Sequence, residues 1–355
     1  MMQAAVFSFT QRGAALGKEI GAFLFEAGYK AVVWTMPKYE DEGALGYPTD
    51  YHDVVEQAMA ECQALVFVGA TGISVRAVAP HLKGKTIDPA IISVDERANF
   101  VIPLIAGHIG GANELARHMA NYIGATACVT TATDVNGLFA VDEWAARNGI
   151  VIGSMKAAKA VATALVNGEE VGLVADSKMS IASALPKNVI LGEQADTGMA
   201  ISIYDNVLPY ETTLQLFPKT VHLGIGCRRN TPLENIEALV LMTLANMHID
   251  MRSVQGIASV DLKKDEQGLL AFAKKYKLAA NFYTADELNS VEGDFTPSAF
   301  VKSIVGVSNV CERSAVLDSK NGELLLRKTS LNGVTIAIAV EDLTIDFAAV
   351  GLRKE

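Results

Sequence analysis

Cysteine is scarce in this sequence, and the few cysteines are far apart. The four, Cys62, Cys128, Cys227 and Cys311, form no CxxC pair or other metal-finger spacing, so we expect no zinc knuckle and no metal site in the protein. Sparse cysteines favour a reducing, cytoplasmic setting. The chain also lacks a basic start ahead of an apolar stretch, and it has no window of about 18 uncharged apolar residues, so we expect neither a signal peptide nor a membrane span.

Positive charge is scarce as well. The 355 residues include 30 Lys and Arg against 40 Asp and Glu, which gives a formal net charge of −10. A broad nucleic-acid surface needs a net basic face, so nucleic acid is not an expected partner, whereas a local basic pocket for a small anion is compatible with this balance. Half of the residues are hydrophobic, and a chain of this length can bury the cores of two or three domains.

The N-terminal third alternates short apolar runs with helical patterns. Residues 4–9, 64–69 and 90–94 are predicted to form buried strands, and residues 111–124 show an amphipathic helical pattern. This alternation predicts an α/β domain with a doubly wound parallel sheet, in which ligands bind beyond the carboxyl ends of the strands. We therefore expect the segments FVGATG and LIAGHIGG, which both complete apolar runs, to lie at that edge.

The pattern changes after this first domain. A turn, an alanine-rich helix and several short strands follow, and then a second alternation of strands and helices begins. We predict an N-terminal α/β domain at residues 1–134, a small middle segment with a linker at 135–217, and a second, C-terminal α/β domain at 218–355.

The segment LGIGCRRNTP predicts a strand, a glycine turn and a helix start. Gly226 would turn the backbone, and Thr231 would cap the next helix in a capping box with Glu234. Such a junction binds anions, and two arginines there add donors for carboxylates or phosphates. The alternative is an ordinary turn with solvated arginines, or a nucleophilic Cys227 whose pKa is depressed by its neighbours. The predicted ligand-binding residues of this loop are Gly226, Cys227, Arg228 and Arg229.

His108 lies among glycines ahead of a helical pattern. Gly110 and Gly111 leave the backbone open and the imidazole uncrowded, and an imidazole near neutral pH is the usual general base. A helix N-terminus also favours the neutral form of the ring. A loop histidine that bonds its neighbours is the alternative. Asn113 and Glu114 fall in the first turn of the helix, where they either cap it or act on a substrate.

A second glycine turn follows the apolar run at residues 64–69. Gly72 permits a ligand to approach backbone N–H groups, while Thr71 either contributes to this site or caps a helix. Arg76 lies one helical turn further on, where it either binds a carboxylate or is solvated on a helix face. We predict that all three bind a ligand.

The order of these segments resembles one known family. The segments are FVGATGISVR at 67–76, APHLKGKTIDPAIISVDE at 79–96, IPLIAGHIGGANELAR at 102–117 and GIGCRR at 224–229. Together with TTATD at 130–134 they are similar to the CbiG family, the cobalt-precorrin-5A hydrolases of the anaerobic cobalamin pathway. The run GHIGGANELAR is the most specific of these signatures.

The resemblance implies a particular hydrolysis. Water opens the δ-lactone that joins the ring-A acetate to the methylated C20 carbon, and C20 then leaves as acetaldehyde, which gives cobalt-precorrin-5B. The implied base is His108, with Asn113 and Glu114 beside it. Lys263, Glu266 and Glu312 match polar positions of the family; the alternatives are a Lys263 that is only solvated and a Glu266 that only favours a helix start. The predicted substrate-binding residues are therefore Thr71, Gly72, Arg76, Gly110, Gly111, Asp134, Gly226, Cys227, Arg228, Arg229, Lys263, Glu266 and Glu312.

The cobalt belongs to the substrate in this reaction, so no cofactor is expected. The expected partners are the cobalt-precorrin tetrapyrrole and, transiently, other enzymes of the cobalamin pathway, without nucleic acid or membrane. Two other functions remain open from the residues alone. One is a non-catalytic tetrapyrrole carrier. The other is a phosphometabolite enzyme that uses the same glycine loops, although the chain has neither a GxGxxG motif with a downstream acidic residue nor GxxxxGK[ST].

Overall fold

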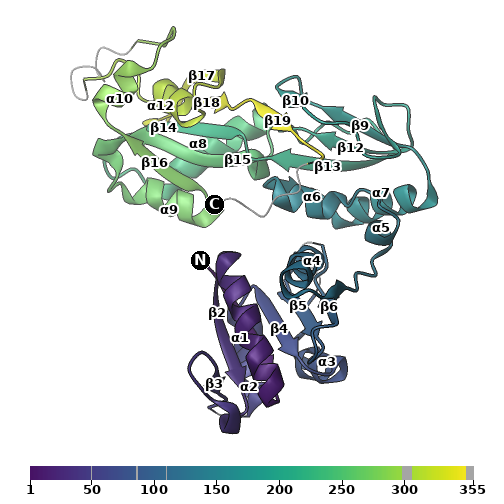
Figure 1. Ribbon diagram of the computed structural model, residues 1–355. Coiled ribbons are helices and arrows are strands. Elements are labelled where there is room, and N and C mark those ends of the chain that lie inside the picture. Colours follow the sequence, from purple (N-terminus) through teal and green to yellow (C-terminus); the bar gives the residue numbers. More distant parts are fainter. Residues whose placement is uncertain (49, 85–86, 109, 298–305, 349–355) are drawn as a thin grey trace. The chain divides into compact units, whose positions relative to one another are not determined.

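The structure is a computed structural model that describes residues 1–48, 50–84, 87–108, 110–297 and 306–348 (Figure 1). The chain divides into two compact units, Met1–Trp144 and Ala145–Val350. The predicted α/β class is confirmed, because each unit is built from sheets covered by helices. Among the helices of the described residues, none is long and apolar enough to cross a membrane.

The first unit is built on a seven-stranded sheet with the order β3-β2-β1-β4-β5-β6-β7. Neighbouring strands from β3 to β5 run parallel, β6 runs antiparallel to β5, and β7 is parallel to β6. The strands are β1 (Met2–Ser8), β2 (Tyr29–Thr35), β3 (Leu45–Gly46), β4 (Ala64–Val68), β5 (Ala90–Val94), β6 (Phe100–Ile105) and β7 (Thr126–Ala127).

The reversal of β6 follows from the short connection before it. The Asp95 carboxylate accepts hydrogen bonds from the backbone N–H groups of Arg97 and Phe100, and Ala98 takes the left-handed conformation, with φ +56°. Two parallel strands need a long crossover, whereas antiparallel strands can be joined by a tight turn. The turn after β6 therefore lies at the amino edge of β4 and β5. The prediction that FVGATG and LIAGHIGG lie at one edge of the sheet is wrong.

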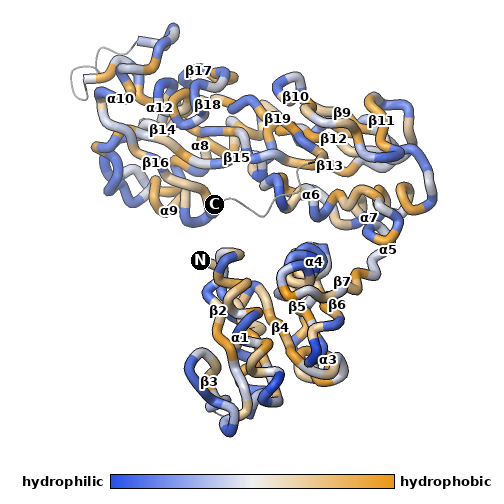
Figure 2. The backbone as a smooth tube through the Cα atoms, viewed as in Figure 1, coloured by the Kyte–Doolittle hydropathy of each residue, from blue (hydrophilic) through white to orange (hydrophobic). Residues whose placement is uncertain are grey.

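Helices cover both faces of this sheet. On one face α1 (Gln11–Glu26) and α4 (Ala112–Ile123) pack on alternate strand residues, and on the other face α2 (Tyr51–Glu61) and α3 (Thr71–Val78) pack on the residues between them. The central strands β4 and β5, buried on both faces, lie toward the hydrophobic end of the colour scale in Figure 2. Two short helices follow β7, α5 (Ala132–Val135) and α6 (Val141–Arg147).

The second unit begins with the middle segment of the chain. Its sheet has the order β11-β9-β12-β13-β8, in which β8 alone is antiparallel to its neighbour, and α7 (Met155–Asn167) packs on this sheet. The strands are β8 (Ile150–Ile152), β9 (Val171–Ala175), β11 (Val189–Leu191), β12 (Thr197–Ile201) and β13 (Thr212–Pro218). A separate strand of this segment, β10 (Met179–Ile181), pairs in parallel with β19 (Leu343–Ile345), close to the end of the chain.

The C-terminal part of the second unit has a mixed sheet of its own, with the order β16-β15-β14-β18-β17. The helices α8 and α9 pack on one face, and α12 packs on the other. Gly224 of β14 lies under α12, where an added Cβ would be 1.8 Å from the carbonyl oxygen of Cys311. The elements are β14 (Val221–Cys227), α8 (Leu233–Asn246), β15 (Val254–Val260), α9 (Gln267–Tyr276), β16 (Ala279–Tyr283), α10 (Ala285–Ser290), α12 (Cys311–Asp318), β17 (Glu323–Leu331) and β18 (Val334–Val340).

Candidate active site

His108 lies in the tight turn between β6 and α4. Ala106 adopts a φ of +56°, which is uncommon for a residue with a side chain, and this is where the chain leaves the strand. The backbone N–H of Ala112 then donates to Ala106 O at 3.2 Å, and the N–H of Asn113 donates to Gly107 O at 2.9 Å. These bonds close the turn and hold His108 at the amino end of α4.

The glycines of this turn are required by packing. A Cβ on Gly107 would lie 2.8 Å from Asn113 Oδ1, and one on Gly110 would lie 2.4 Å from the Cβ of Ala106. Gly111 has a φ of +78° as the residue before the helix. The glycines thus allow the turn to form, and the substrate-binding role predicted for Gly110 and Gly111 stays a prediction.

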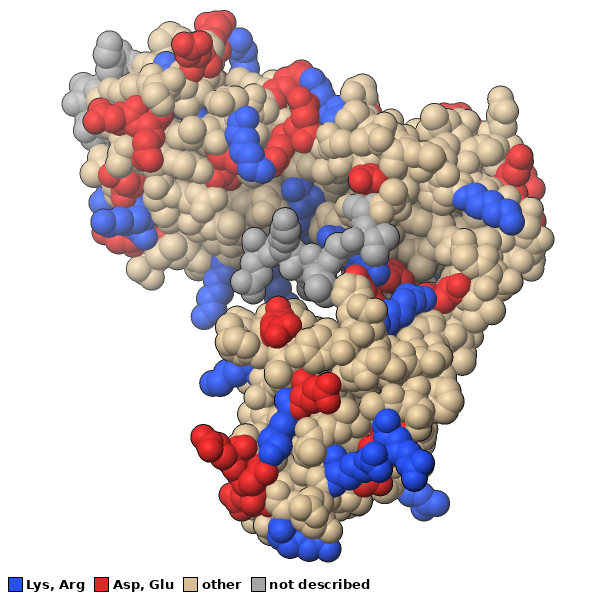
Figure 3. Space-filling view, viewed as in Figure 1, with Lys and Arg blue, Asp and Glu red and all other residues tan. Residues whose placement is uncertain are grey.

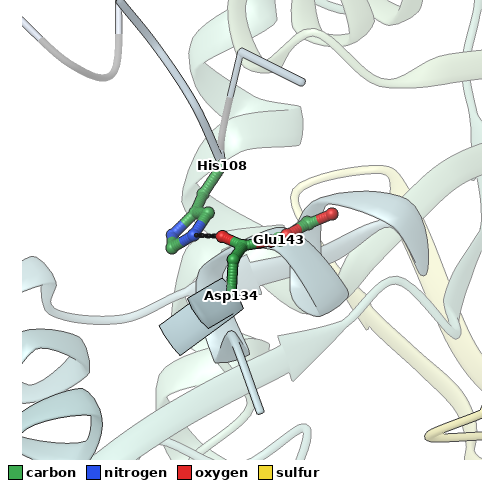
Figure 4. A group of neighbouring side chains, drawn as sticks. All are labelled: His108, Asp134 and Glu143. Atoms are coloured by element: carbon green, nitrogen blue, oxygen red, sulfur yellow. Dashed lines mark hydrogen bonds and ion pairs between the residues drawn. The ribbon is translucent and has the colours of Figure 1, made fainter. Parts of the chain in front are cut away.

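The His108 ring lies between carboxylates from two short helices. Its Nε2 is 2.9 Å from Asp134 Oδ2 and 3.2 Å from Thr133 Oγ1, while its Nδ1 is 3.2 Å from Asp142 Oδ1. Figure 4 shows His108 and Asp134 pointing toward each other. The His108 side chain is only 16% exposed, so these contacts are partly shielded from water.

Asp134 is the centre of the hydrogen-bond network. Its Oδ2 accepts from Asn113 Nδ2 at 2.9 Å and from the Thr131 hydroxyl, and its Oδ1 accepts from Arg117. Asn113, which is buried, also donates to the Thr131 hydroxyl. Asn113 therefore fixes Asp134 and does not cap α4, so the capping alternative for this residue is wrong. Glu114 lies in the first turn of α4, where the sequence placed it.

These contacts set the charge of the site. The hydrogen bond with Asp142 is the main cause that raises the pKa of His108 to about 9, while burial opposes it and Asp134 adds to it. Burial tends to raise the pKa of Asp134, but bonds from Arg117, Thr131 and His108 lower it to about 2. His108 is thus an imidazolium at neutral pH.

The sequence-based prediction of a neutral imidazole is therefore wrong. The positive end of a helix does disfavour the imidazolium, but its effect is that of a partial charge. Two full carboxylates within hydrogen-bond distance favour the charged form more strongly. Asp142 was missed because acidic residues at a helix start are common, and Asp142 and Glu143 in the first turn of α6 give no sign of a contact with a distant loop.

The residues of the other glycine turn do not join this cluster. Thr71 is the first residue of α3, and Ala70 precedes it as the cap, so Thr71 does not cap the helix. The Thr71 hydroxyl accepts a 3.4 Å hydrogen bond from Ser93, and Gly72 and Arg76 are exposed. Because these residues follow β4, they lie at the opposite edge of the sheet from His108.

The arginine loop of the second unit also differs from its prediction. Gly226 is within β14, and the chain turns at Asn230, which has a φ of +59°. The Thr231 hydroxyl donates to Arg228 O at 2.8 Å, and α8 begins only at Leu233 without a side-chain cap. The predicted turn at Gly226 is wrong because Gly226 lies within β14. The predicted capping box is wrong because the Thr231 hydroxyl bonds to the loop and not to α8.

The two arginines of this loop have different surroundings. Arg229 donates to Asp265 Oδ1 at 2.6 Å and to Leu262 O at 2.7 Å, whereas Arg228 is exposed beside Gly333. Burial raises the pKa of Cys227, so the alternative of a reactive thiol with a depressed pKa is wrong. Of the two guanidinium groups, that of Arg228 is the more available to a ligand.

Three polar residues predicted in the second unit are held by protein groups. Lys263 Nζ lies 3.5 Å from the buried carboxylate of Glu266. Glu312 is fully buried, and its two oxygens accept from the backbone N–H groups of Thr296 at 2.8 Å and Lys328 at 2.7 Å. Glu312 therefore joins two segments of the fold, and its predicted role in substrate binding stays a prediction.

Sequence reasoning also missed a buried network in the second unit. His222 Nδ1 is 2.6 Å from Asp318 Oδ2, while Asp318 Oδ1 accepts from Asn281 Nδ2 and the Tyr283 hydroxyl, each at 2.7 Å. Burial raises the pKa of Tyr283, and its bond to Asp318 adds to this effect. The one sequence feature that could have indicated this network is His222, a histidine within an apolar strand.

One cluster in the first unit has the composition of a metal site. Ligand atoms of His108, Asp134 and Glu143 lie within 4.8 Å of one another. However, both oxygens of Asp134 already accept from protein donors, including the Arg117 guanidinium. A cation would have to displace that positive group, so the donor set fits an ion-pair network better than a metal centre.

On the face of the molecule that Figure 3 shows, Lys and Arg side chains are interspersed with Asp and Glu side chains.

Comparisons with known proteins give a consistent result. Three family models match successive parts of the chain: "Cobalamin synthesis G N-terminal" at residues 53–134, "Cobalamin biosynthesis central region" at 139–218 and "Cobalamin synthesis G C-terminus" at 221–339. Cobalt-precorrin-5A hydrolase from Salmonella typhimurium is 35% identical over 347 residues, which cover 95% of this chain and 97% of that protein. The protein of the same name from Priestia megaterium is 30% identical, with coverages of 95% and 94%.

Among solved structures, a cobalamin biosynthesis protein G homolog from Sulfolobus solfataricus is similar to this chain. It is 20% identical, the match covers 95% of this chain and 97% of that one, and the TM-score is 0.42.

Proposed function

The chain belongs to the CbiG family of cobalamin synthesis proteins, and from that membership we propose that it is a cobalt-precorrin-5A hydrolase. The relatives that bear this name match almost the whole chain. The proposed reaction opens the δ-lactone of the substrate with water and releases the C20 carbon as acetaldehyde, leaving cobalt-precorrin-5B.

The position of His108 is the main structural support for the proposed function, because it identifies a candidate active site. It lies in the most specific family signature, it contacts two carboxylates, and its side chain is still 16% exposed. The reaction requires proton transfer at the C20 oxygen, first when the lactone C–O bond breaks and again when the C–C bond breaks. A histidine with its charge set by neighbouring carboxylates is suited to such transfers.

The other residues of the cluster have supporting roles in this proposal. Asn113 and Thr131 hold Asp134, and Arg117 balances its charge. Asp134 in turn fixes the Nε2 side of the His108 ring. Held in this way, the imidazole needs little reorganisation when charge develops on the substrate.

Substrate binding is proposed to use exposed cationic side chains. The substrate bears many peripheral carboxylates, and guanidinium groups bind carboxylates through two parallel hydrogen bonds. Arg228 meets this requirement best in the loop after β14, because Arg229 is already engaged by Asp265. Arg76, with Thr71 and Gly72, lies at the opposite edge of its sheet from His108, so its proposed role is limited to a carboxylate remote from the lactone.

The test is the release of acetaldehyde by the His108→Gln variant. The variant should fold and bind cobalt-precorrin-5A, because Gln retains hydrogen-bonding groups, but it should release acetaldehyde at least about 100-fold more slowly, the low end of what general acid–base catalysis contributes. His52→Gln, at an exposed position of α2, is the matched control and should react at the normal rate. A normal rate for His108→Gln would remove His108 from the chemistry, and loss of binding alone would make it a binding residue.

A further inference from the structure

The His108 ring is held by two carboxylates that differ in their other contacts. Asp134, on α5, accepts from Arg117, Thr131 and Asn113 as well as facing Nε2. Asp142, on α6, faces Nδ1 at 3.2 Å, and its Oδ1 also accepts from the backbone N–H of Glu143 at 3.0 Å. The Asp134 side is thus rigidly held, and the Asp142 side is held by fewer bonds.

Asp134 and Asp142 each face a cation in this cluster. The guanidinium of Arg117 lies against Asp134, so that carboxylate has a cation other than His108. The cation that lies against Asp142 is His108 itself. Glu143 places a further carboxylate in the same cluster. Among the ion pairs of the described residues, a neutral imidazole would leave the Asp142 carboxylate, whose side chain is only 20% exposed, without a cation, which is unfavourable in a partly shielded site.

We propose that Asp142 is a positioning residue for the hydrolysis: it keeps His108 in the imidazolium form, so that His108 enters the reaction as an acid and becomes a base only afterwards. This inference rests on the proposed function. It assigns a role to a residue outside the set predicted from the sequence, and it determines the order of the two proton transfers.

The first transfer accompanies opening of the lactone. A water molecule adds its hydroxyl to the lactone carbonyl carbon and releases its other proton to solvent. As the bond from that carbon to the C20 oxygen breaks, the electron pair moves to the C20 oxygen, and the imidazolium gives that oxygen its proton. The products of this step are the free acetate side chain, a hydroxyl on C20 and a neutral His108.

The second transfer returns the proton. Neutral His108 takes the proton of the C20 hydroxyl, the C20–O bond becomes the carbonyl of acetaldehyde, and the electron pair of the breaking C–C bond moves into the conjugated ring of the substrate. His108 is again an imidazolium and the cycle is complete. Both ring nitrogens face carboxylates, and the proposal places the C20 oxygen at Nδ1, where it replaces Asp142 as the acceptor of the proton, because the contact of Nδ1 with Asp142, at 3.2 Å, is longer than that of Nε2 with Asp134, at 2.9 Å.

The pH dependence of the reaction rate can distinguish whether His108 acts first as an acid or first as a base. The pKa of His108 is raised to about 9, first by Asp142 and then by Asp134. A reaction that begins with the imidazolium is therefore fast at neutral pH and slows as pH rises through this value. A reaction that begins with neutral imidazole would instead accelerate over the same range.

The experiment combines a titration with a rate profile for Asp142→Asn. Imidazole NMR of the substrate-free protein reports the pKa of His108, which should be lower in Asp142→Asn by about one pH unit or more, as expected for the loss of an opposite charge at this distance. The alkaline limb of acetaldehyde release should move to lower pH by a similar amount. In Asp142→Glu, which keeps the negative charge, both the pKa of His108 and the alkaline limb should lie closer to those of the natural protein than they do in Asp142→Asn. Asp53→Asn, an exposed acidic residue in the first turn of α2, is the control and should move neither.

The outcomes separate this inference from the proposed function. An unchanged His108 titration in Asp142→Asn, or a normal His108 pKa near 6.5 in the natural protein, overturns the inference. A shifted titration with an unshifted rate profile also overturns it, because His108 would then be held by Asp142 without serving as the acid. Failure of the natural protein to release acetaldehyde from cobalt-precorrin-5A rejects the proposed function instead. If Asp142→Asn does not fold, the same comparison is made with Asp142→Glu, whose longer side chain must shift both quantities together.

Discussion

Replacing Asp134 by Asn should destabilise the first unit in a way that depends on pH. Asp134 joins α5 to the His108 turn and to α4 through His108, Asn113 and Arg117. An Asn side chain has the same shape, but it lacks the negative charge, and its NH2 group would face other donors. The variant therefore removes one charge and leaves a buried donor poorly matched, while the packing changes little.

The magnitude follows from the pKa of this carboxyl. The contacts lower it from 3.8 to about 2, which corresponds to roughly 2 kcal/mol of stability at neutral pH. Because the folded-state pKa is lowered, this stability is present above the unfolded-state pKa and is lost as pH falls toward 2. The part shared with His108, whose pKa is raised, is lost as pH rises through about 9. The difference between the two proteins should therefore be greatest between about pH 5 and 6.5.

The chain offers a specific probe for this measurement. Of its two tryptophans, Trp34 lies on β2 inside the first unit, whereas Trp144 is at the boundary, on α6, which continues to Arg147 of the second unit. With Trp144→Phe in both proteins, the fluorescence of Trp34 during urea denaturation reports the first unit. Unfolding free energies of both proteins at a series of pH values from 3 to 9 give the difference directly.

The control is Asp53→Asn, which removes the same charge from an exposed position in the same unit. It should change the free energy of unfolding by less than about 0.5 kcal/mol. A difference for Asp134→Asn that is constant over the whole pH range, or no larger than that of the control, would refute the ion-pair network as the source of stability.

Two further predictions concern the second unit. Gly224→Ala should abolish cooperative unfolding of this unit, measured by circular dichroism, because its Cβ would lie 1.8 Å from a carbonyl oxygen of α12; Gly72→Ala, with nothing within 4 Å, is the control and should leave the unfolding of the protein unchanged. Arg228→Ala should weaken binding of cobalt-precorrin-5A in titrations by roughly 1.5–3 kcal/mol, and Arg229→Ala should weaken it less because Asp265 already engages that side chain. Equal affinities of natural protein and Arg228→Ala would remove the loop from the site.

Local patterns predicted the elements of the fold well. Apolar runs at residues 64–69 and 90–94 are the strands β4 and β5, and the amphipathic pattern at 111–124 is α4. Each of these signals depends on residues that are close in sequence. Strand direction depends instead on the connection, and the turn after Asp95 was not recognised as too short for a crossover. The edge on which His108 lies was therefore predicted incorrectly.

The candidate site shows the same division. The glycines around His108 were readable as a tight turn, and Asp134 was chosen through the family signature. The charge of His108 was not readable, because Asp142 approaches it only after α6 folds back onto the turn. Electrostatics at a site is a property of tertiary contacts, so a sequence can identify the ionisable residue without identifying its protonation state.

The pairing of β10 with β19 has a consequence for biosynthesis of the chain. These strands lie 164 residues apart at Ser180 and Thr344, so β10 is made well before its partner. Until β19 has been made, the edge of β10 that it covers has unpaired backbone groups, which are a template for pairing with other chains. The middle segment thus cannot complete its structure before β19 has been made, and a chain that stops before β19 is expected to be prone to aggregation even though the core sheets of both units are already encoded.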